Sequence, residues 1–134
     1  MLIVIKGYCL SGKTAAIIEY EKLFTEKNKN CLIFVPHYLQ NTNNGILKSR
    51  NGSESIKPAA YIEELDEFGP LKEYDVVLID NADPFDNLPF FTEKWISEGK
   101  TVVLTGRPDN ENIIDTLPQA DKVITLVSKC EMCV

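Results

Sequence analysis

Residues 2–14 read LIVIKGYCLSGKT, and this stretch decides the fold. Its first half is a β-branched and aliphatic run, which predicts a strand buried on both faces. Its second half, Gly7 to Thr14, has the pattern G-x-x-x-x-G-K-T of a phosphate-binding loop. Residues 14–29 then predict an amphipathic helix. The alternative is a glycine-rich turn with an exposed lysine, but a strand, this loop and a helix in succession favour the phosphate loop.

Each fixed residue of the loop has a physical task. Gly7 and Gly12 permit backbone angles and a close approach that a side chain would block. The N–H groups of the loop then converge on phosphate oxygens, helped by the positive end of the helix dipole. Lys13 supplies a charge to the β- and γ-phosphates, and the Thr14 hydroxyl is a ligand for Mg²⁺. The pattern therefore predicts a bound nucleoside triphosphate with Mg²⁺.

A second Mg²⁺ group is expected at the end of another buried strand. Asp80 closes the run DVVLID at residues 75–80, and a strand-end Asp commonly completes such a site. The alternative is an Asp that only caps the next turn. We favour the metal role for Asp80.

Apolar runs at residues 31–35, 101–105 and 122–127 predict further strands, and residues 87–98 and 109–117 predict helices. Strands that alternate with helices indicate an α/β fold, a three-layer sandwich like those of P-loop NTPases, with a mainly parallel sheet of about five or six strands. We expect one domain over residues 1–134.

Three local features complete this expectation. In the helix predicted at residues 14–29, the spacing of the apolar residues places Ile17 and Leu23 on the buried face and leaves Glu21 exposed to solvent. Residues 38–55 are polar and show no sustained period, which predicts a flexible loop. Residues 56–65 predict a short strand and a brief helix.

Composition excludes several classes of function. The 134 residues carry a net charge of −6, so a nucleic-acid partner is not expected, because phosphate neutralisation needs a basic face. No apolar run approaches the roughly 18 residues of a membrane span. Four cysteines do not make a secreted disulfide framework, so a cytoplasmic location is expected.

Four segments together resemble the thymidine kinase family of animals, bacteria and large DNA viruses. GYCLSGKT resembles the family's GPMFSGKS/T loop, and IDNADPF lies where the family has IDEGQFF or IDEAQFF. EGKTVVLTG is similar to GKTVIVAAL, and PQADKVITLVSKCEMC matches P-x-A-x-x-V-x-K-L-x-A-x-C-x-x-C in spacing.

This resemblance implies transfer of the γ-phosphate of ATP to the 5′-hydroxyl of thymidine. It also implies a homo-oligomer, because the family forms tetramers. Asp80 would hold Mg²⁺. The triphosphate would be bound by Gly7, Ser11, Gly12, Lys13 and Thr14.

The sequence departs from the family in the segments that would bind and activate the nucleoside. Asn81 stands where the family has a carboxylate, and an amide cannot take a proton near neutral pH, so impaired turnover is expected. Asp83 could substitute only if its loop refolds, and is otherwise a turn residue before Pro84. The family's K-x-x-D-x-R-Y has no counterpart, which leaves Lys48, Arg50 and Arg107 as cations. The alternative for each of them is a solvated surface charge. The stretch after Gly106 is shorter than in the family, and its base-clamping loop beyond the CxxC has no counterpart before Val134.

Cys130 and Cys133 have the spacing of half a zinc site, whereas a structural site needs four ligands. Three interpretations stay open: a relic without metal, which we favour, a Zn²⁺ shared across a dimer, or a redox pair. Cys9, Cys31 and His37 are not expected to be ligands.

Three functions are thus in view. The first is an ATP-dependent kinase acting on a deoxynucleoside, and the second is a nucleotide-binding protein of the same lineage without phosphoryl transfer. The third, least favoured, is an unrelated small P-loop ATPase or motor.

Overall fold

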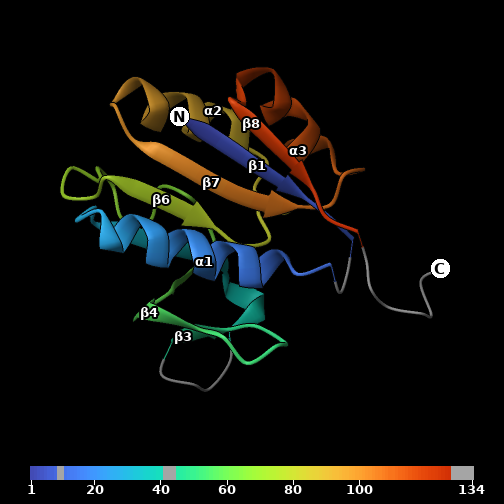
Figure 1. Ribbon diagram of the computed structural model, residues 1–134. Coiled ribbons are helices and arrows are strands. Elements are labelled where there is room, and N and C mark those ends of the chain that lie inside the picture. The colour runs from blue at the N-terminus through green and yellow to red at the C-terminus, as the bar shows by residue number, and fades with distance from the viewer. Residues whose placement is uncertain (9–10, 41–44, 128–134) are drawn as a thin grey trace.

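The computed structural model describes residues 1–8, 11–40 and 45–127 (Figure 1). Its long elements alternate between strand and helix, as the apolar runs predict. Two short 3-10 turns, His37–Leu39 and Leu117–Gln119, complete the described chain. The strands and helices in chain order are β1 (Leu2–Lys6), α1 (Lys13–Glu26), β2 (Cys31–Pro36), β3 (Ile46–Lys48), β4 (Glu54–Pro58), β5 (Ala60–Ile62), β6 (Val76–Ile79), α2 (Leu88–Ser97), β7 (Thr101–Gly106), α3 (Glu111–Thr116) and β8 (Lys122–Thr125).

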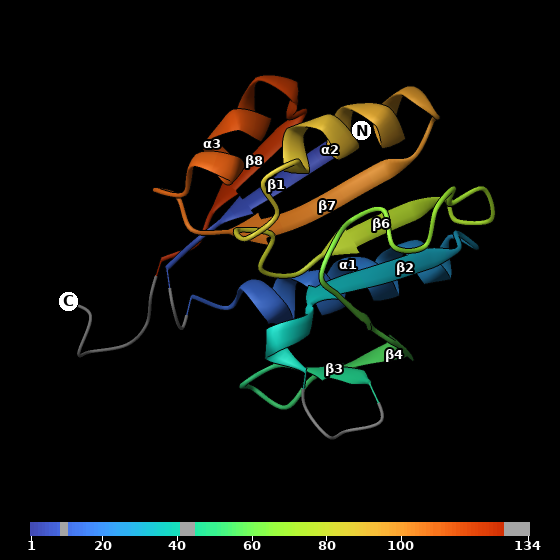
Figure 2. The same ribbon diagram turned by 180° about the vertical axis from the view of Figure 1, so that it is seen from behind.

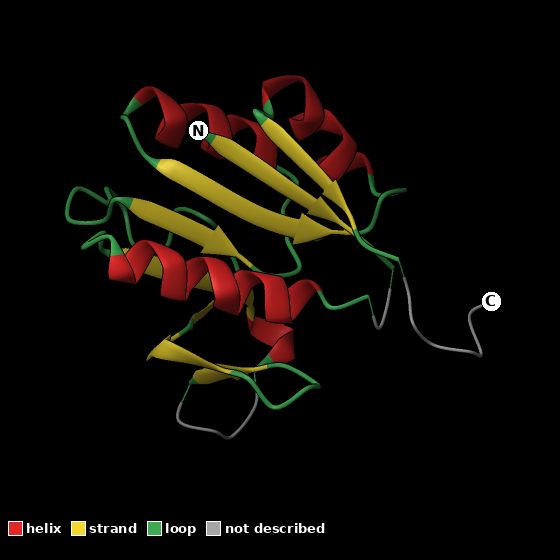
Figure 3. Ribbon diagram, in the orientation of Figure 1, coloured by secondary structure: helices red, strands yellow, loops and turns green. Residues whose placement is uncertain are grey.

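The main sheet has six strands in the order β5-β2-β6-β7-β1-β8, and every neighbouring pair is parallel. Helix α1 covers one face, whereas α2 and α3 cover the other (Figures 1 and 3). The view from behind shows the same three layers (Figure 2). The fold is therefore an α/β three-layer sandwich with a parallel sheet, as predicted.

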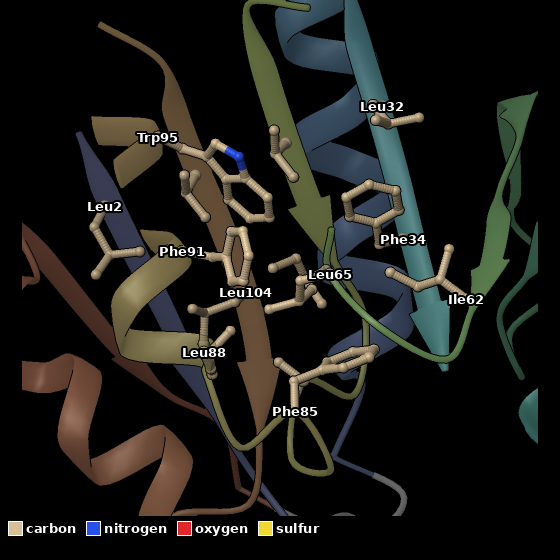
Figure 4. Close-up of a cluster of buried hydrophobic side chains, with 14 of the residues drawn as sticks. Leu2, Leu32, Phe34, Ile62, Leu65, Phe85, Leu88, Phe91, Trp95 and Leu104 are labelled. Carbon is tan, nitrogen blue, oxygen red and sulfur yellow. The ribbon is translucent and has the colours of Figure 1, made fainter. Parts of the chain in front are cut away.

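Alternation along the buried strands builds a core on each face of the sheet. In β1, Leu2 and Val4 belong to the cluster under α2, while Ile3 and Ile5 belong to the cluster under α1. The first cluster is rich in aromatic rings, and the centroids of Phe34 and Trp95 are 6.2 Å apart (Figure 4). Because helices cover both faces of the main sheet, the side chains on both sides of its central strands are apolar, and these strands appear in the sequence as continuous apolar runs.

Helix α1 differs from the prediction at Glu21, whose side chain is 0% exposed. Its Oε1 accepts a hydrogen bond from the backbone N–H of Ile56 (2.8 Å), and its Oε2 accepts one from Lys57 (3.0 Å). Leu23, expected inside, is 42% exposed. The expected orientation was wrong because strand β4 packs against this side of the helix, and helical periodicity cannot reveal a partner 35 residues away.

Residues 38–55 are not a loop throughout. Strands β3 and β4 pair antiparallel as a separate two-stranded hairpin, with Ile46 opposite Pro58 (Figure 2). The prediction missed the hairpin because its one apolar anchor, Leu47, is too little for a visible period. Residues 56–65 hold parts of β4 and β5, and no helix occurs among them. No helix in the described ranges is long and apolar enough to cross a membrane.

Candidate functional site

The loop at residues 7–14 connects the end of β1 to the start of α1. Gly12 has φ 91° and precedes the helix, so the left-handed angle explains glycine at this position. At Gly7 a Cβ would collide with the Ser11 side chain and crowd Leu126. The backbone N–H of Gly7 donates to the carbonyl of Gly106 (3.0 Å), which ties the loop to β7.

Lys13 and Ser11 present polar atoms within this loop. The Lys13 Nζ donates to the carbonyl oxygen of Gly7 (2.7 Å), so the ammonium lies across the loop. The Ser11 Oγ is buried and has no hydrogen-bond partner among the described residues. An orphaned buried hydroxyl is costly in isolation, and a phosphate oxygen would satisfy it.

Asp80 meets the loop at the end of β6. The Thr14 Oγ1 donates to Asp80 Oδ2 (2.7 Å), and the Thr105 Oγ1 donates to Asp80 Oδ1 (3.0 Å). Asp80 is 1% exposed, and burial raises its pKa above the ordinary 3.8, although both hydroxyl hydrogen bonds and the Lys13 charge oppose the shift. The contact with Thr14 joins two segments that are 66 residues apart in sequence.

A cavity of about 690 Å³ opens above this loop, which is within the usual size range of small-molecule sites. The hairpin turn after β3 forms one wall, and the ends of β6 and β7 form another. The lining residues are Ser11, Gly12, Lys13, Thr14, Ala15, Tyr38, Ser49, Arg50, Asn51, Asn81, Asp83 and Arg107.

The segment after Asp80 turns sharply at Asn81, which has φ 58°. Asn tolerates this left-handed angle better than most residues. Its backbone N–H donates to Thr105 Oγ1 (2.9 Å). Asp83 also lines the cavity, and its Oδ2 accepts a hydrogen bond from the backbone N–H of Arg107 (2.8 Å). The turn itself brings the Asp83 side chain to the cavity.

The three cations named from the sequence lie in different surroundings. Arg50 and Arg107 line the cavity, but Lys48 does not. The Arg107 guanidinium lies 5.5 Å from the centroid of the Tyr8 ring and pairs with Asp109 (3.3 Å). Hydrogen bonding to Asp109 raises the pKa of Arg107, so this side chain stays charged.

The cavity includes residues that sequence reasoning missed, notably Tyr38, Ser49 and Asn51. Asn51-Gly52 is a hairpin-turn signal that could have indicated the fold of this wall. Thr105 was read only as the last residue of a strand, although its hydroxyl contacts Asp80.

Cys130 and Cys133, for which a relic, a shared Zn²⁺ and a redox pair stayed open, lie outside the described residues. Among the residues that the structure describes, no group of three or more His, Cys, Asp or Glu side chains could hold a metal ion. Cys31 is buried as a free thiol, and burial raises its pKa. His37 is exposed at the start of the 3-10 turn.

Comparisons with known proteins agree with the geometry. A model of the thymidine kinase family matches residues 1–134. Thymidine kinase 1 of Dictyostelium discoideum is 28% identical over 141 residues, which cover 97% of this chain and 61% of the relative. The thymidine kinase of Myxoma virus (strain Lausanne) is 24% identical over 136 residues, covering 97% of this chain and 75% of the relative. The chain thus spans about three fifths of the length of the first relative. Because the match extends over every residue, the chain belongs to the thymidine kinase family.

Proposed function

We propose that this chain binds ATP with Mg²⁺ and transfers the γ-phosphate to the 5′-hydroxyl of a deoxynucleoside, with thymidine as the first substrate to test. The observation that carries the proposal is the 2.7 Å contact between Thr14 Oγ1 and Asp80 Oδ2 beside Lys13. The names of the relatives support the choice of thymidine.

The donor set fits Mg²⁺. The cation prefers hard oxygen ligands, and Thr14 and Asp80 offer a hydroxyl and a carboxylate. Asp80 is buried without an ion pair within the described part of the chain, so a cation would offset the cost of its charge. Thr14 and Asp80 would hold Mg²⁺, which when bound offsets the negative charge of the phosphates.

Each remaining task belongs to a named group of the chain. The backbone N–H groups of the loop bind the phosphate oxygens, and Ser11 Oγ donates to one of them. The Lys13 ammonium leaves the Gly7 carbonyl and binds the β- and γ-phosphates. Arg50 and Arg107 both line the cavity and contribute positive charge to it. The chain therefore positions the triphosphate and neutralises its charge, which is most of what phosphoryl transfer requires.

The test is a transfer assay with purified protein, Mg²⁺-ATP and thymidine, in which dTMP and ADP are quantified together. Equal amounts of both products, lost in Lys13→Ala, are the expected result. Lys6→Ala, which changes a lysine just before the loop, is the matched control.

A second function is favoured by Asn81, whose amide cannot accept a proton. In that case the protein binds the nucleotide and does not transfer phosphate. Mg²⁺-dependent nucleotide binding without dTMP formation would support this alternative. If ADP forms without thymidine and DNA stimulates its formation, the protein is instead an ATPase or motor.

A further inference from the structure

We propose that Asp83 is the carboxylate that accepts the proton of the attacking hydroxyl in this chain. The inference rests on the proposed function and names the missing general base of the same site. It concerns a residue three positions after Asp80, on the turn that leads away from strand β6.

Elimination among the cavity residues supports this assignment. Asp83 is the one acidic side chain that lines the cavity within the described residues. Asp80 is 1% exposed, and both of its oxygens accept hydrogen bonds from Thr14 and Thr105. Asn81 has no proton-accepting group. A general base must reach the proton that it abstracts, so Asp83 is the carboxylate in position to serve.

The two oxygens of Asp83 have different surroundings. Oδ2 accepts the backbone N–H of Arg107 (2.8 Å), which fixes the orientation of the carboxylate. Oδ1 accepts no hydrogen bond among the described residues and is free to accept a proton. Oδ1 is therefore the proton-accepting atom.

The turn that carries Asp83 is held at several points, which a base needs for positioning. The backbone N–H of Ala82 donates to the carbonyl of Thr105 (2.8 Å). The Asn112 Nδ2 donates to the carbonyl of Asp83 itself (2.7 Å). Strand β7 and helix α3 thus fix the turn from two sides.

In the transfer step, the 5′-oxygen of the nucleoside forms a bond to the γ-phosphorus, while the bond between that phosphorus and the β,γ-bridging oxygen breaks. The proton of the 5′-hydroxyl moves to Asp83 Oδ1 and then to solvent. The products are the nucleoside monophosphate and ADP.

The decisive variant is Asp83→Asn, because the amide oxygen can still accept the Arg107 N–H but cannot take a proton. We expect kcat for dTMP formation to fall by about 100- to 10,000-fold. The Kd of Mg²⁺-ATP should stay within about twofold, since the loop is untouched. Asp86→Asn is the matched control, because Asp86 is exposed on the next turn of the same connection between β6 and α2 and does not line the cavity.

A binding measurement gives a readout that is independent of turnover. With a non-hydrolysable ATP analogue bound, thymidine should bind more tightly than 5′-deoxythymidine, which lacks the attacking hydroxyl. Because a carboxylate accepts a stronger hydrogen bond than an amide, Asp83→Asn should reduce this preference by about fivefold. An unchanged preference would contradict contact between Asp83 and the hydroxyl.

Asn81→Glu, with Asn81→Gln as its length-matched control, separates the failures of the two proposals. Turnover that is lost in Asp83→Asn and partly restored by adding Asn81→Glu supports both. If turnover is retained in Asp83→Asn, the role of Asp83 as the base is overturned, but the proposed kinase activity stands. An inactive wild type with an active Asn81→Glu variant overturns both the role of Asp83 and phosphoryl transfer by the native chain, and supports nucleotide binding without transfer. If neither the wild type nor Asn81→Glu forms dTMP although both bind ATP, the role of Asp83 and the proposed phosphoryl transfer are both overturned.

Discussion

Replacing Glu21 by Gln tests how the hairpin is held to the rest of the fold. The buried carboxylate accepts hydrogen bonds from the backbone N–H groups of Ile56 and Lys57. A Gln at this position keeps one acceptor but turns an NH₂ group toward the second N–H. One buried donor is then left without a partner, which costs about 1–3 kcal/mol. We expect the free energy of unfolding to fall by about that amount.

Urea denaturation measures the change. With an m-value of about 2 kcal/mol/M, a loss of about 2 kcal/mol lowers the midpoint by about 1 M. Glu19→Gln is the matched control, because Glu19 is exposed on the same helix and should leave the midpoint unchanged. If Glu21→Gln and Glu19→Gln have the same midpoint, the carboxylate does not hold the hairpin and the reasoning is refuted.

The same variant should weaken nucleotide binding, although Glu21 does not line the cavity. Strands β3 and β4 flank the turn that supplies Ser49, Arg50 and Asn51 to the cavity wall. A hairpin that detaches from α1 no longer presents this wall. A Kd of Mg²⁺-ATP that is unchanged in Glu21→Gln would show that the hairpin contributes nothing to the site.

Two further substitutions probe the sheet edge that carries the site. Burial raises the pKa of Asp80 above 3.8, so above this pH the folded state holds its proton longer than the unfolded state, and the free energy of unfolding falls as pH rises. In urea denaturation without Mg²⁺, the free energy of unfolding of Asp80→Asn should therefore depend less on pH than that of the wild type. If the wild type instead becomes more stable relative to this variant between pH 4 and 7, the raised pKa of Asp80 is contradicted. Asp80→Asn should also lose the stabilisation by Mg²⁺-ATP, which is about 2.7 kcal/mol at 100 times Kd. Gly106→Ala should cost about 1–3 kcal/mol, because the new methyl group collides with Ile113, and thermal melting should show partial recovery in the double variant with Ile113→Val. A melting temperature unchanged by Gly106→Ala would mean that Ile113 moves away freely.

The sequence predicts the sheet well because its central strands are buried on both faces. The runs around Val4, Leu78 and Leu104 are continuously apolar, which leaves a parallel sheet between helices as the natural arrangement. The contact between Thr14 and Asp80 could be anticipated for a related reason. Asp80 directly follows β6, and Thr14 lies in the first turn of the helix that follows β1, so both lie where the carboxyl ends of the parallel strands meet at one edge of the sheet.

The features that escaped prediction depend on contacts between distant residues. Glu21 is buried because β4 supplies backbone donors, and the hairpin has almost no apolar pattern of its own. Asp83 was expected to be a turn residue unless its loop refolds, and its place in the cavity lining escaped prediction because a left-handed Asn81 and the Thr105 hydroxyl turn the chain there. Such long-range polar contacts leave no period in the sequence, so only the folded structure reveals them.

The most direct test of a phosphate loop that shares Mg²⁺ between Thr14 and Asp80 is a titration of the purified protein with a fluorescent ATP analogue, with Mg²⁺ and with EDTA. Saturable binding that weakens at least tenfold in EDTA, and that loses its Mg²⁺ dependence in Thr14→Ala, is the predicted result. Binding that is absent, or equally tight with EDTA and in Thr14→Ala, would contradict the account.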